Sequence, residues 1–298
     1  MSADTIRHTV YDIWGFRMKP KRKVSSREVG LKIGWICGEY FLKMEHLHYG
    51  YWPEDLDVDI ANVRLAQDEY VKFLLSHIPE GVKTILDVGC GAGRVARKLI
   101  SMGYQVDCVS PSTHLTEEAR KSVGDQSHIF NCKYQHMQTD KRYDLVMFVE
   151  SFQYISLLRA LEQTAEFLNP GGHMLICDIF KKDVEGEGKQ KGGHPLRNFF
   201  THIETCPFTL VEDIDITEQT APTMDIMNDI LVNVGKPVMD TVNEFLADRY
   251  PKIYKLVTWK FREDIEKLNE KYSGGSRTAE QFKKYKSYRL MLYRKDVS

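Results

Sequence analysis

The segment Ile85-Leu-Asp-Val-Gly-Cys-Gly-Ala-Gly93 decides the fold, because a short apolar run ends in an acidic residue and then turns on three glycines. Thr84 to Val88 has the length of a buried strand, and Arg94 to Met102 carries apolar residues at helical spacing. In an open α/β sheet ligands bind beyond the carboxyl ends of strands, where glycines let the backbone approach closely. The segment therefore predicts a strand, a ligand-binding turn and a helix.

The spacing of these glycines disfavours a dinucleotide as the ligand. A pyrophosphate-binding turn follows the pattern G-x-G-x-x-G. Here the third glycine comes one residue early, and Arg94 stands in the expected place. We therefore expect a ligand that does not depend on a phosphate at the helix N-terminus.

Strands alternate with helices along the middle of the chain. Val106 to Val109 ends at Ser110-Pro-Ser112 and precedes a charged helix that runs to about Ser122. Further strands are expected at Ile129 to Tyr134, Tyr143 to Val149, His173 to Ile179, Phe208 to Ile216 and Tyr288 to Tyr293. This alternation predicts an α/β protein with a Rossmann-like, doubly wound and mostly parallel sheet.

Helical spacing marks the regions on either side of this core. Amphipathic helices are expected from Ser26 to Lys43 and from Ile60 to Leu75, and about 70 helical residues separate the last two strands, with a break near Gly235 and Pro237. The stretch from Lys181 to Gly193 is rich in glycine and charge and predicts a mobile loop. The chain then divides into a flexible basic arm (1–24), an N-terminal helical cover (25–76), an α/β core (77–217), a helical lid insertion (218–283) and a last core strand (284–298).

Composition excludes several classes of protein. The 298 residues include 41 basic and 42 acidic ones, so the net charge of −1 argues against a nucleic-acid partner. Six scattered cysteines without a C-x-x-C pair indicate reduced thiols, and no Cys or His spacing predicts a metal site. No apolar run approaches the roughly 20 residues of a membrane span, and no signal peptide is visible, so we expect a cytoplasmic protein.

One segment departs from the balanced charge. Arg17-Met-Lys-Pro-Lys-Arg-Lys23 holds five cations in seven residues. It is either a solvated tail or a peripheral contact with an acidic membrane surface. The sequence leaves the oligomeric state open.

The glycine turn also resembles a known family. Leu86-Asp-Val-Gly-Cys-Gly-Ala-Gly93 is similar to motif I of the class I S-adenosylmethionine-dependent methyltransferases, and Tyr143-Asp-Leu-Val-Met147 and Leu168-Asn-Pro-Gly-Gly172 resemble later motifs of that family. The resemblance covers about residues 48 to 217 and the terminal strand. It implies a seven-stranded sheet with an antiparallel last strand and S-adenosylmethionine as cofactor. By match, Asp87 would hold the ammonium, and Gly89, Gly91 and Gly93 would pass along the methionine portion; Cys90 is a further candidate cofactor contact.

A branch of the family is also indicated. The second strand of the family usually ends in an acid, whereas Ser110 stands here, followed by Pro111 and Ser112. This resembles the branch of cyclopropane fatty acid synthases, sterol C-methyltransferases and coclaurine-type or sarcosine-type N-methyltransferases. The resemblance places Ser110 at the position that contacts the ribose. His136 is a candidate near the adenine, although a solvated loop role is an alternative, and Ser112 and Gln135 are further candidate cofactor contacts. Asp107 lies inside the strand, and we expect it to matter less.

An aromatic segment and a strand-end acid complete the candidate site. His48-Tyr-Gly-Tyr-Trp52 resembles the branch's aromatic segment, whose rings would face a sulfonium, so Tyr49, Tyr51 and Trp52 are candidate cofactor contacts. Alternatively, these rings pack the N-terminal helices onto the sheet. The branch commonly has a Glu followed four residues later by His after strand four. Here Glu150 is present and Tyr154 replaces the His, so the candidate catalytic residues are Glu150, Tyr154 and Tyr49, with Glu150 also at the cofactor.

These features predict an enzyme that moves a methyl group by in-line displacement to a small molecule. The acceptor would be an amine or an apolar, lipid-like carbon or heteroatom. Two alternatives are cyclopropane-type methylene transfer to a lipid, which needs a base, and a non-catalytic module that binds the cofactor. The Asn/Asp-Pro-Pro-Tyr/Phe segment of many nucleic-acid methyltransferases is absent.

Overall fold

A single mostly parallel sheet forms the centre of the protein. The computed structural model describes residues 36–185, 192–263, 265–266 and 277–297. The strands follow the order β3-β2-β1-β4-β5-β8-β7. Their bounds are β1 (Thr84–Val88), β2 (Gln105–Val109), β3 (Ile129–Phe130), β4 (Tyr143–Val149), β5 (Leu168–Lys181), β7 (Phe208–Asp215) and β8 (Lys286–Lys295), and the short β6 (His194–Pro195) pairs with β5. β8 is antiparallel to both of its neighbours, β5 and β7, whereas the other strand pairs among the described residues are parallel, which confirms the predicted fold.

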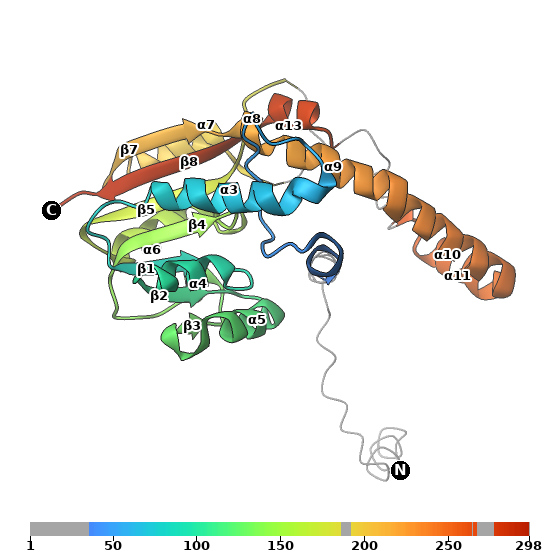
Figure 1. Cartoon of the computed structure of the whole chain (residues 1–298), viewed down its shortest axis with the longest axis horizontal. Helices are drawn as coiled ribbons and strands as arrows, with labels where there is room; N and C mark the ends of the chain where they lie inside the picture. Colours follow the sequence, from blue (N-terminus) through green and yellow to red (C-terminus); the bar gives the residue numbers. More distant parts are fainter. Residues whose placement is uncertain (1–35, 186–191, 264, 267–276, 298) are drawn as a thin grey trace, which may run out of the picture.

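Helices cover both faces of the sheet (Figure 1). Alternate strand residues point to opposite faces, so Ile85 and Leu145 join one buried cluster while Leu86 and Val146 join the other. The first cluster is completed by α3 (Val63–Ser76), α4 (Arg94–Ser101) and α5 (Thr113–Val123), and the second by α6 (Leu157–Phe167) and α7 (Leu196–Ile203). Short 3₁₀ turns are η1 (Ile60–Asn62), η2 (Gly124–Gln126), η3 (Tyr134–His136) and η4 (Phe152–Tyr154).

The insertion between β7 and β8 is helical, as predicted. It comprises α8 (Thr217–Thr220), α9 (Pro222–Ile230), the π-helical η5 (Leu231–Gly235), α10 (Lys236–Arg249), α11 (Pro251–Lys260) and α13 (Ala279–Tyr285). The π turn lies at the predicted break, because Pro237 has no N–H to donate to the carbonyl of Asn233. The Lys236 N–H bonds instead to the Leu231 carbonyl. In Figure 1, α10 and α11 extend away from the sheet as an arm.

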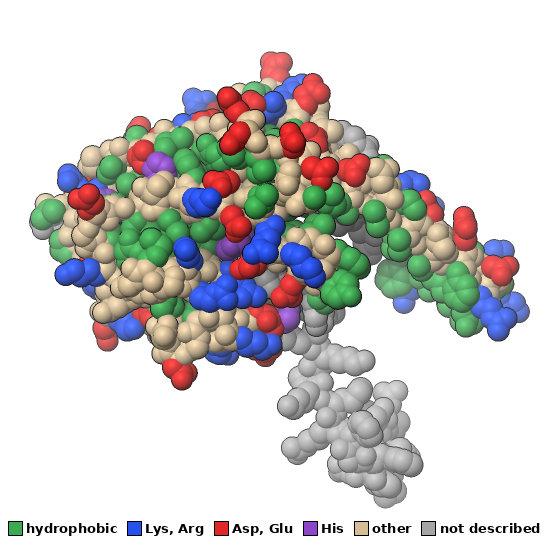
Figure 2. Space-filling view, viewed as in Figure 1, with side chains coloured by type: hydrophobic (Ala, Val, Ile, Leu, Met, Phe, Trp, Pro, Cys, Tyr) green, Lys and Arg blue, Asp and Glu red, His purple; other side chains and the backbone are tan. Residues whose placement is uncertain are grey.

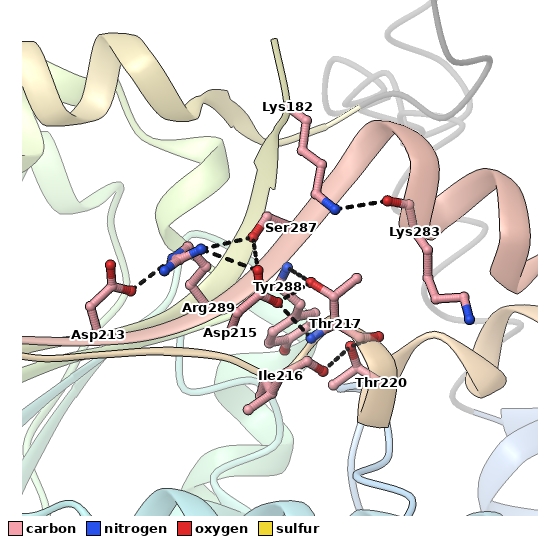
Figure 3. Close-up of polar contacts among 10 residues, drawn as sticks. All are labelled: Lys182, Asp213, Asp215, Ile216, Thr217, Thr220, Lys283, Ser287, Tyr288 and Arg289. Carbon is pink, nitrogen blue, oxygen red and sulfur yellow. Dashed lines mark hydrogen bonds and ion pairs between the residues drawn. The ribbon is translucent and has the colours of Figure 1, made fainter. Parts of the chain in front are cut away.

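Polar contacts hold the two ends of this insertion together (Figure 3). Arg289 on β8 pairs with Asp213 at 2.7 Å and Asp215 at 3.1 Å at the end of β7. Asp215 accepts hydrogen bonds from Thr217 and Ser287, and the Thr217 hydroxyl accepts one from the Tyr288 N–H at 2.8 Å. The network fixes the chain where it leaves the sheet and where it returns.

The predicted elements agree with the observed ones more closely in the core than at its edges. β1 and β4 have the predicted bounds, β3 is shorter than expected, and β5 begins early, at Leu168. The basic segment 17–23 and the first part of the predicted helix 26–43 lie outside the described residues, but residues 36–42 are helical. Along the described parts of the chain, no helix is both long and apolar enough to span a bilayer.

Candidate active site

A cavity of about 540 Å³ opens at the carboxyl ends of β1, β2 and β4. Residues that directly follow these three strands form its walls, and residues 45–48 and 133–135 complete it. Nine predicted site residues line it: Asp87, Gly89, Cys90, Gly91, Ser110, Ser112, Gln135, Glu150 and Tyr154. The structure therefore brings together side chains from four separate sequence motifs.

A larger cavity, of about 960 Å³, lies at the opposite edge of the sheet, where β1, β2 and β4 begin. Asp107 belongs to this second cavity and bonds to Lys141 at 2.7 Å and to the Tyr143 hydroxyl at 2.8 Å. Ligands of open α/β sheets bind at the carboxyl ends of the strands, so the smaller cavity is the candidate active site. The position of Asp107 agrees with the minor role expected for it.

The three glycines of the turn are needed for different reasons. All three have positive φ, at 83° for Gly89, 55° for Gly91 and 74° for Gly93. A Cβ on Gly89 would lie 2.4 Å from the Ser151 Cβ, and one on Gly93 would lie 3.0 Å from the Ala119 Cα. A Cβ on Gly91 would meet nothing within 4 Å. Gly89 and Gly93 are therefore required by packing, whereas Gly91 keeps open space in the cavity wall.

Asp87 is a buried carboxyl group with an unsatisfied oxygen. Its exposed fraction is 2%, and no hydrogen-bond partner for Oδ2 lies among the described residues. Burial raises the pKa of Asp87 from 3.8 to about 7. An unpartnered buried oxygen beside an open glycine turn fits a cationic group of a ligand, such as an ammonium.

Glu150 follows β4 in a strained conformation. Its φ of 51° lies in the left-handed region that residues other than glycine rarely adopt, and such strain concentrates at functional sites. Its Oε1 accepts hydrogen bonds from the Tyr49 N–H at 2.6 Å and the Tyr288 hydroxyl at 2.7 Å. Burial raises the pKa of Glu150 to about 8, although the two hydrogen bonds oppose this rise. The carboxyl group is thus fixed in position and readily ionised by a nearby cation.

The serines after β2 shape the next part of the wall. Ser110 is 2% exposed, and its hydroxyl accepts a 3.4 Å bond from the Ser112 N–H. Ser112 in turn caps α5 by accepting from the Leu115 N–H at 3.4 Å. Gln135 lines the cavity, whereas the adjacent His136 is exposed and does not.

The aromatic segment lies behind the cavity wall. The Tyr49 hydroxyl donates to Met224 Sδ at 3.1 Å, the Tyr51 ring stacks on Phe73, and Trp52 Nε1 donates to Thr223 at 3.0 Å. Trp52 is 5% exposed. None of the three rings lines the cavity, and Gly93 does not line it either. The rings pack the N-terminal segment against α3 and α9, which is the alternative that the sequence left open.

The sequence did not single out His48 as a site residue. His48 lines the cavity, and its ring stacks on Tyr70, with ring centroids 4.4 Å apart. Nδ1 lies 2.7 Å from the Tyr49 carbonyl, and Nε2 is buried without a partner among the described residues. Burial lowers the pKa of His48 to about 3, so the ring is neutral, with Nδ1–H donating and Nε2 free to accept. His48 is the first residue of the aromatic segment His48–Trp52, and this position was the signal in the sequence that could have found it.

Among the described residues, no group of three or more His, Cys, Asp or Glu side chains is placed to hold a metal ion. The predicted lid does not contribute to the cavity wall either. In the described part of the chain, no residue after Ile155 lines the cavity. Closure of the insertion over the site stays a prediction.

Comparison with known proteins identifies the family. A family model for a methyltransferase domain matches residues 61–212, about half of the chain, and includes the glycine turn, β4 and Glu150. The chain belongs to this family and is an S-adenosylmethionine-dependent methyltransferase. It is 24% identical over 194 residues to an uncharacterized methyltransferase of Mycobacterium tuberculosis, covering 63% of this chain and 70% of that one. It is 27% identical over 220 residues to an O-methyltransferase of Pyrenophora dematioidea, and the match covers 67% of this chain and 82% of that one.

Solved structures share the fold. Geranyl diphosphate C-methyltransferase of Streptomyces coelicolor superposes with a TM-score of 0.63 at 15% identity, over 92% of this chain and 99% of that one. The [4+2]-cyclase SpnF superposes with a TM-score of 0.62 at 17% identity, over 92% of this chain and 97% of that one. The cyclopropane synthase MmaA2 of Mycobacterium tuberculosis superposes with a TM-score of 0.60 at 15% identity, over 84% of this chain and 90% of that one. The fold predicted from the glycine turn is therefore confirmed.

Proposed function

We propose that the cavity at β1, β2 and β4 holds S-adenosylmethionine and that methyl transfer takes place beside Glu150. The observation that carries this proposal is the buried, unpartnered Oδ2 of Asp87 next to the open space at Gly91. Asp87 would hold the ammonium of the cofactor, and the backbone at Gly91 would leave room for its methionine portion. Ser110, Ser112 and Gln135 would meet the nucleoside.

Glu150 is the group that we assign to the reacting end. The bound cofactor supplies a methyl group on a positively charged sulfur. Both donors described above bond to Oε1 of Glu150, so Oε2 is the oxygen that would meet an acceptor or the positive charge. Because the carboxyl is held by two donors, it keeps its orientation while an acceptor binds.

His48 supplies a second polar group to the acceptor side. The branch histidine is replaced by Tyr154, which is 57% exposed at the cavity. The unpartnered Nε2 of His48 would instead accept a hydrogen bond from an N–H or O–H of the acceptor and orient its nucleophilic atom. Tyr49 would act through its backbone, because its N–H holds Glu150 while its hydroxyl bonds to Met224.

We propose a small-molecule acceptor, either an amine or an apolar, lipid-like molecule with a nucleophilic carbon or heteroatom. Support comes from relatives and neighbours named for O-methylation and for C-methylation of geranyl diphosphate. Cyclopropane-type chemistry is less favoured because it needs a group that removes a proton from the methylated carbon, and Tyr154 stands where the branch has its histidine.

Turnover with methyl-labelled S-adenosylmethionine tests the proposal. The full chain is incubated with panels of amines, isoprenoid alcohols and unsaturated lipids, and products are identified by mass spectrometry and NMR. We expect label in a simple methyl group of one class of acceptor and an equal amount of S-adenosylhomocysteine. A cyclopropane ring would contradict simple methyl transfer, and cofactor binding without turnover on any panel would favour the non-catalytic module.

A further inference from the structure

The arm formed by α10 and α11 exposes an apolar surface. Neither helix has a buried residue, whereas the preceding α9 buries Thr223, Met224 and Ile226. The exposed fractions are 61% for Phe245, 62% for Ile253, 61% for Leu256 and 76% for Trp259. Figure 2 shows hydrophobic side chains gathered along the arm. Such patches on soluble proteins mark an interaction site.

Positive charge accompanies this apolar surface. Helix α11 contains Lys252, Lys255 and Lys260 and no acidic residue, and Arg249 ends α10 just before it. In Figure 2, Lys and Arg side chains lie at the tip of the arm next to hydrophobic ones, and acidic side chains also lie along the arm. The acids of α10 are Asp240, Glu244 and Asp248, so the excess of positive charge belongs to α11. A helix with lysines, aliphatic side chains and an exposed Trp is typical of segments that lie in the headgroup region of anionic membranes.

We propose that the α10–α11 arm docks the enzyme on an anionic lipid surface. The apolar side chains of α11 would enter the boundary between headgroups and acyl chains, while its lysines meet phosphate and carboxylate groups. A second copy of the chain fits less well. In a two-fold contact centred on α11, the same lysines would face each other, whereas anionic headgroups complement them.

The base of the arm is firmly attached to the core. The Ala279 N–H donates to Asp225 at 2.8 Å, and Lys283 pairs with Glu218 at 2.8 Å. Together with the network at the end of β7, these contacts join the insertion to the sheet (Figure 3). At about 1.5 Å per residue, the 14 residues of α10 extend about 20 Å. Docking would therefore hold the catalytic core close to the bilayer, whatever the methyl acceptor.

Vesicle sedimentation of the full chain tests the proposal. We expect binding to vesicles that contain phosphatidylserine, little binding to phosphatidylcholine alone, and weaker binding at high salt. The double variants Ile253→Ser with Trp259→Ser, and Lys252→Glu with Lys255→Glu, should each weaken binding about tenfold or more. Matched controls are Leu65→Ser with Leu158→Ser, which are 51% and 48% exposed on α3 and α6, and Lys98→Glu with Lys121→Glu.

Two results would overturn the proposal. In one, the arm variants bind the vesicles as tightly as the wild type, so that any lipid contact lies elsewhere, as in residues 17–23. In the other, the wild type does not bind, and light scattering shows a dimer that the arm variants convert to monomer. Cofactor binding should be unchanged in all arm variants, which separates this test from that of the active site.

Discussion

The Tyr288 hydroxyl donates a hydrogen bond to Glu150 Oε1 over 2.7 Å and so connects β8 to the residue that follows β4. The Tyr70 hydroxyl lies 2.9 Å from that of Tyr288 and extends the contact to α3. Three elements that are distant in sequence thus set the position of one carboxyl group. Glu150 and Tyr288 should therefore be coupled in catalysis.

Substitutions of Glu150 and of Tyr288 should have different effects, because Glu150 is assigned to the reaction itself and Tyr288 only positions it. Glu150→Gln should lower kcat at least tenfold with a small change in cofactor affinity. Tyr288→Phe removes a hydrogen bond that lowers the pKa of Glu150, so the rise of kcat with pH should move to higher pH. Tyr293→Phe, a buried position on the same strand, is the control. An unmoved pH profile in Tyr288→Phe would contradict the positioning role.

Because there is open space at Gly91, a large side chain there should block cofactor binding while the protein still folds. Gly91→Arg should abolish binding of S-adenosylmethionine, because the side chain would enter the cavity, while the far-ultraviolet dichroism stays that of the wild type. Gly103→Arg is a matched control, since Gly103 has a φ of 97°, an open Cβ position and a place outside the cavity. Equal effects of both variants would mean that backbone strain, and not the cavity, is responsible.

Asp87 predicts a pH-dependent stability. Its pKa is raised to about 7 in the folded protein, so the folded state binds more protons than the unfolded state between about pH 4 and 7. The stability that Asp87 contributes is fully present below that range and is lost as the pH rises. Compared with the wild type, Asp87→Asn should therefore gain in Tm as the pH increases from 4 to 8, while losing cofactor affinity. A Tm difference that is flat with pH would refute this.

Because the rings of the aromatic segment pack behind the cavity wall, loss of their contacts should lower the stability of the fold and leave cofactor binding unchanged. The Thr223 hydroxyl accepts from Trp52 Nε1 at 3.0 Å and from the Gly50 N–H at 3.2 Å. Thr223→Val leaves two buried donors unpaired and should reduce the free energy of unfolding by about 1 to 3 kcal/mol. Unfolding in denaturant measures this change in the free energy of unfolding. The control is Thr241→Val, on the exposed surface of α10. Weakened cofactor binding at unchanged stability would instead place the rings at the cofactor.

The sequence predicted what local patterns encode. β1, the glycine turn and α4 are contiguous, and the strand-end residues Asp87, Ser110 and Glu150 meet because parallel strands share one edge. Tyr288 lies 138 residues from Glu150, and no local pattern marks that pairing. The rings of Tyr51 and Trp52 pack away from the cavity because α3 and α9, distant in sequence, provide their partners. The apolar spacing of α10 and α11 predicted helices, but not that they extend from the core.

Isothermal titration of the full chain with S-adenosylmethionine tests the central claim most directly. We expect micromolar affinity with release of protons near pH 7, because a cation beside Asp87 and Glu150 favours their ionised forms. Titration in buffers of different ionisation enthalpy counts these protons, and Asp87→Asn should release fewer. If neither S-adenosylmethionine nor S-adenosylhomocysteine binds the wild type, the assignment of this cavity as the active site is contradicted.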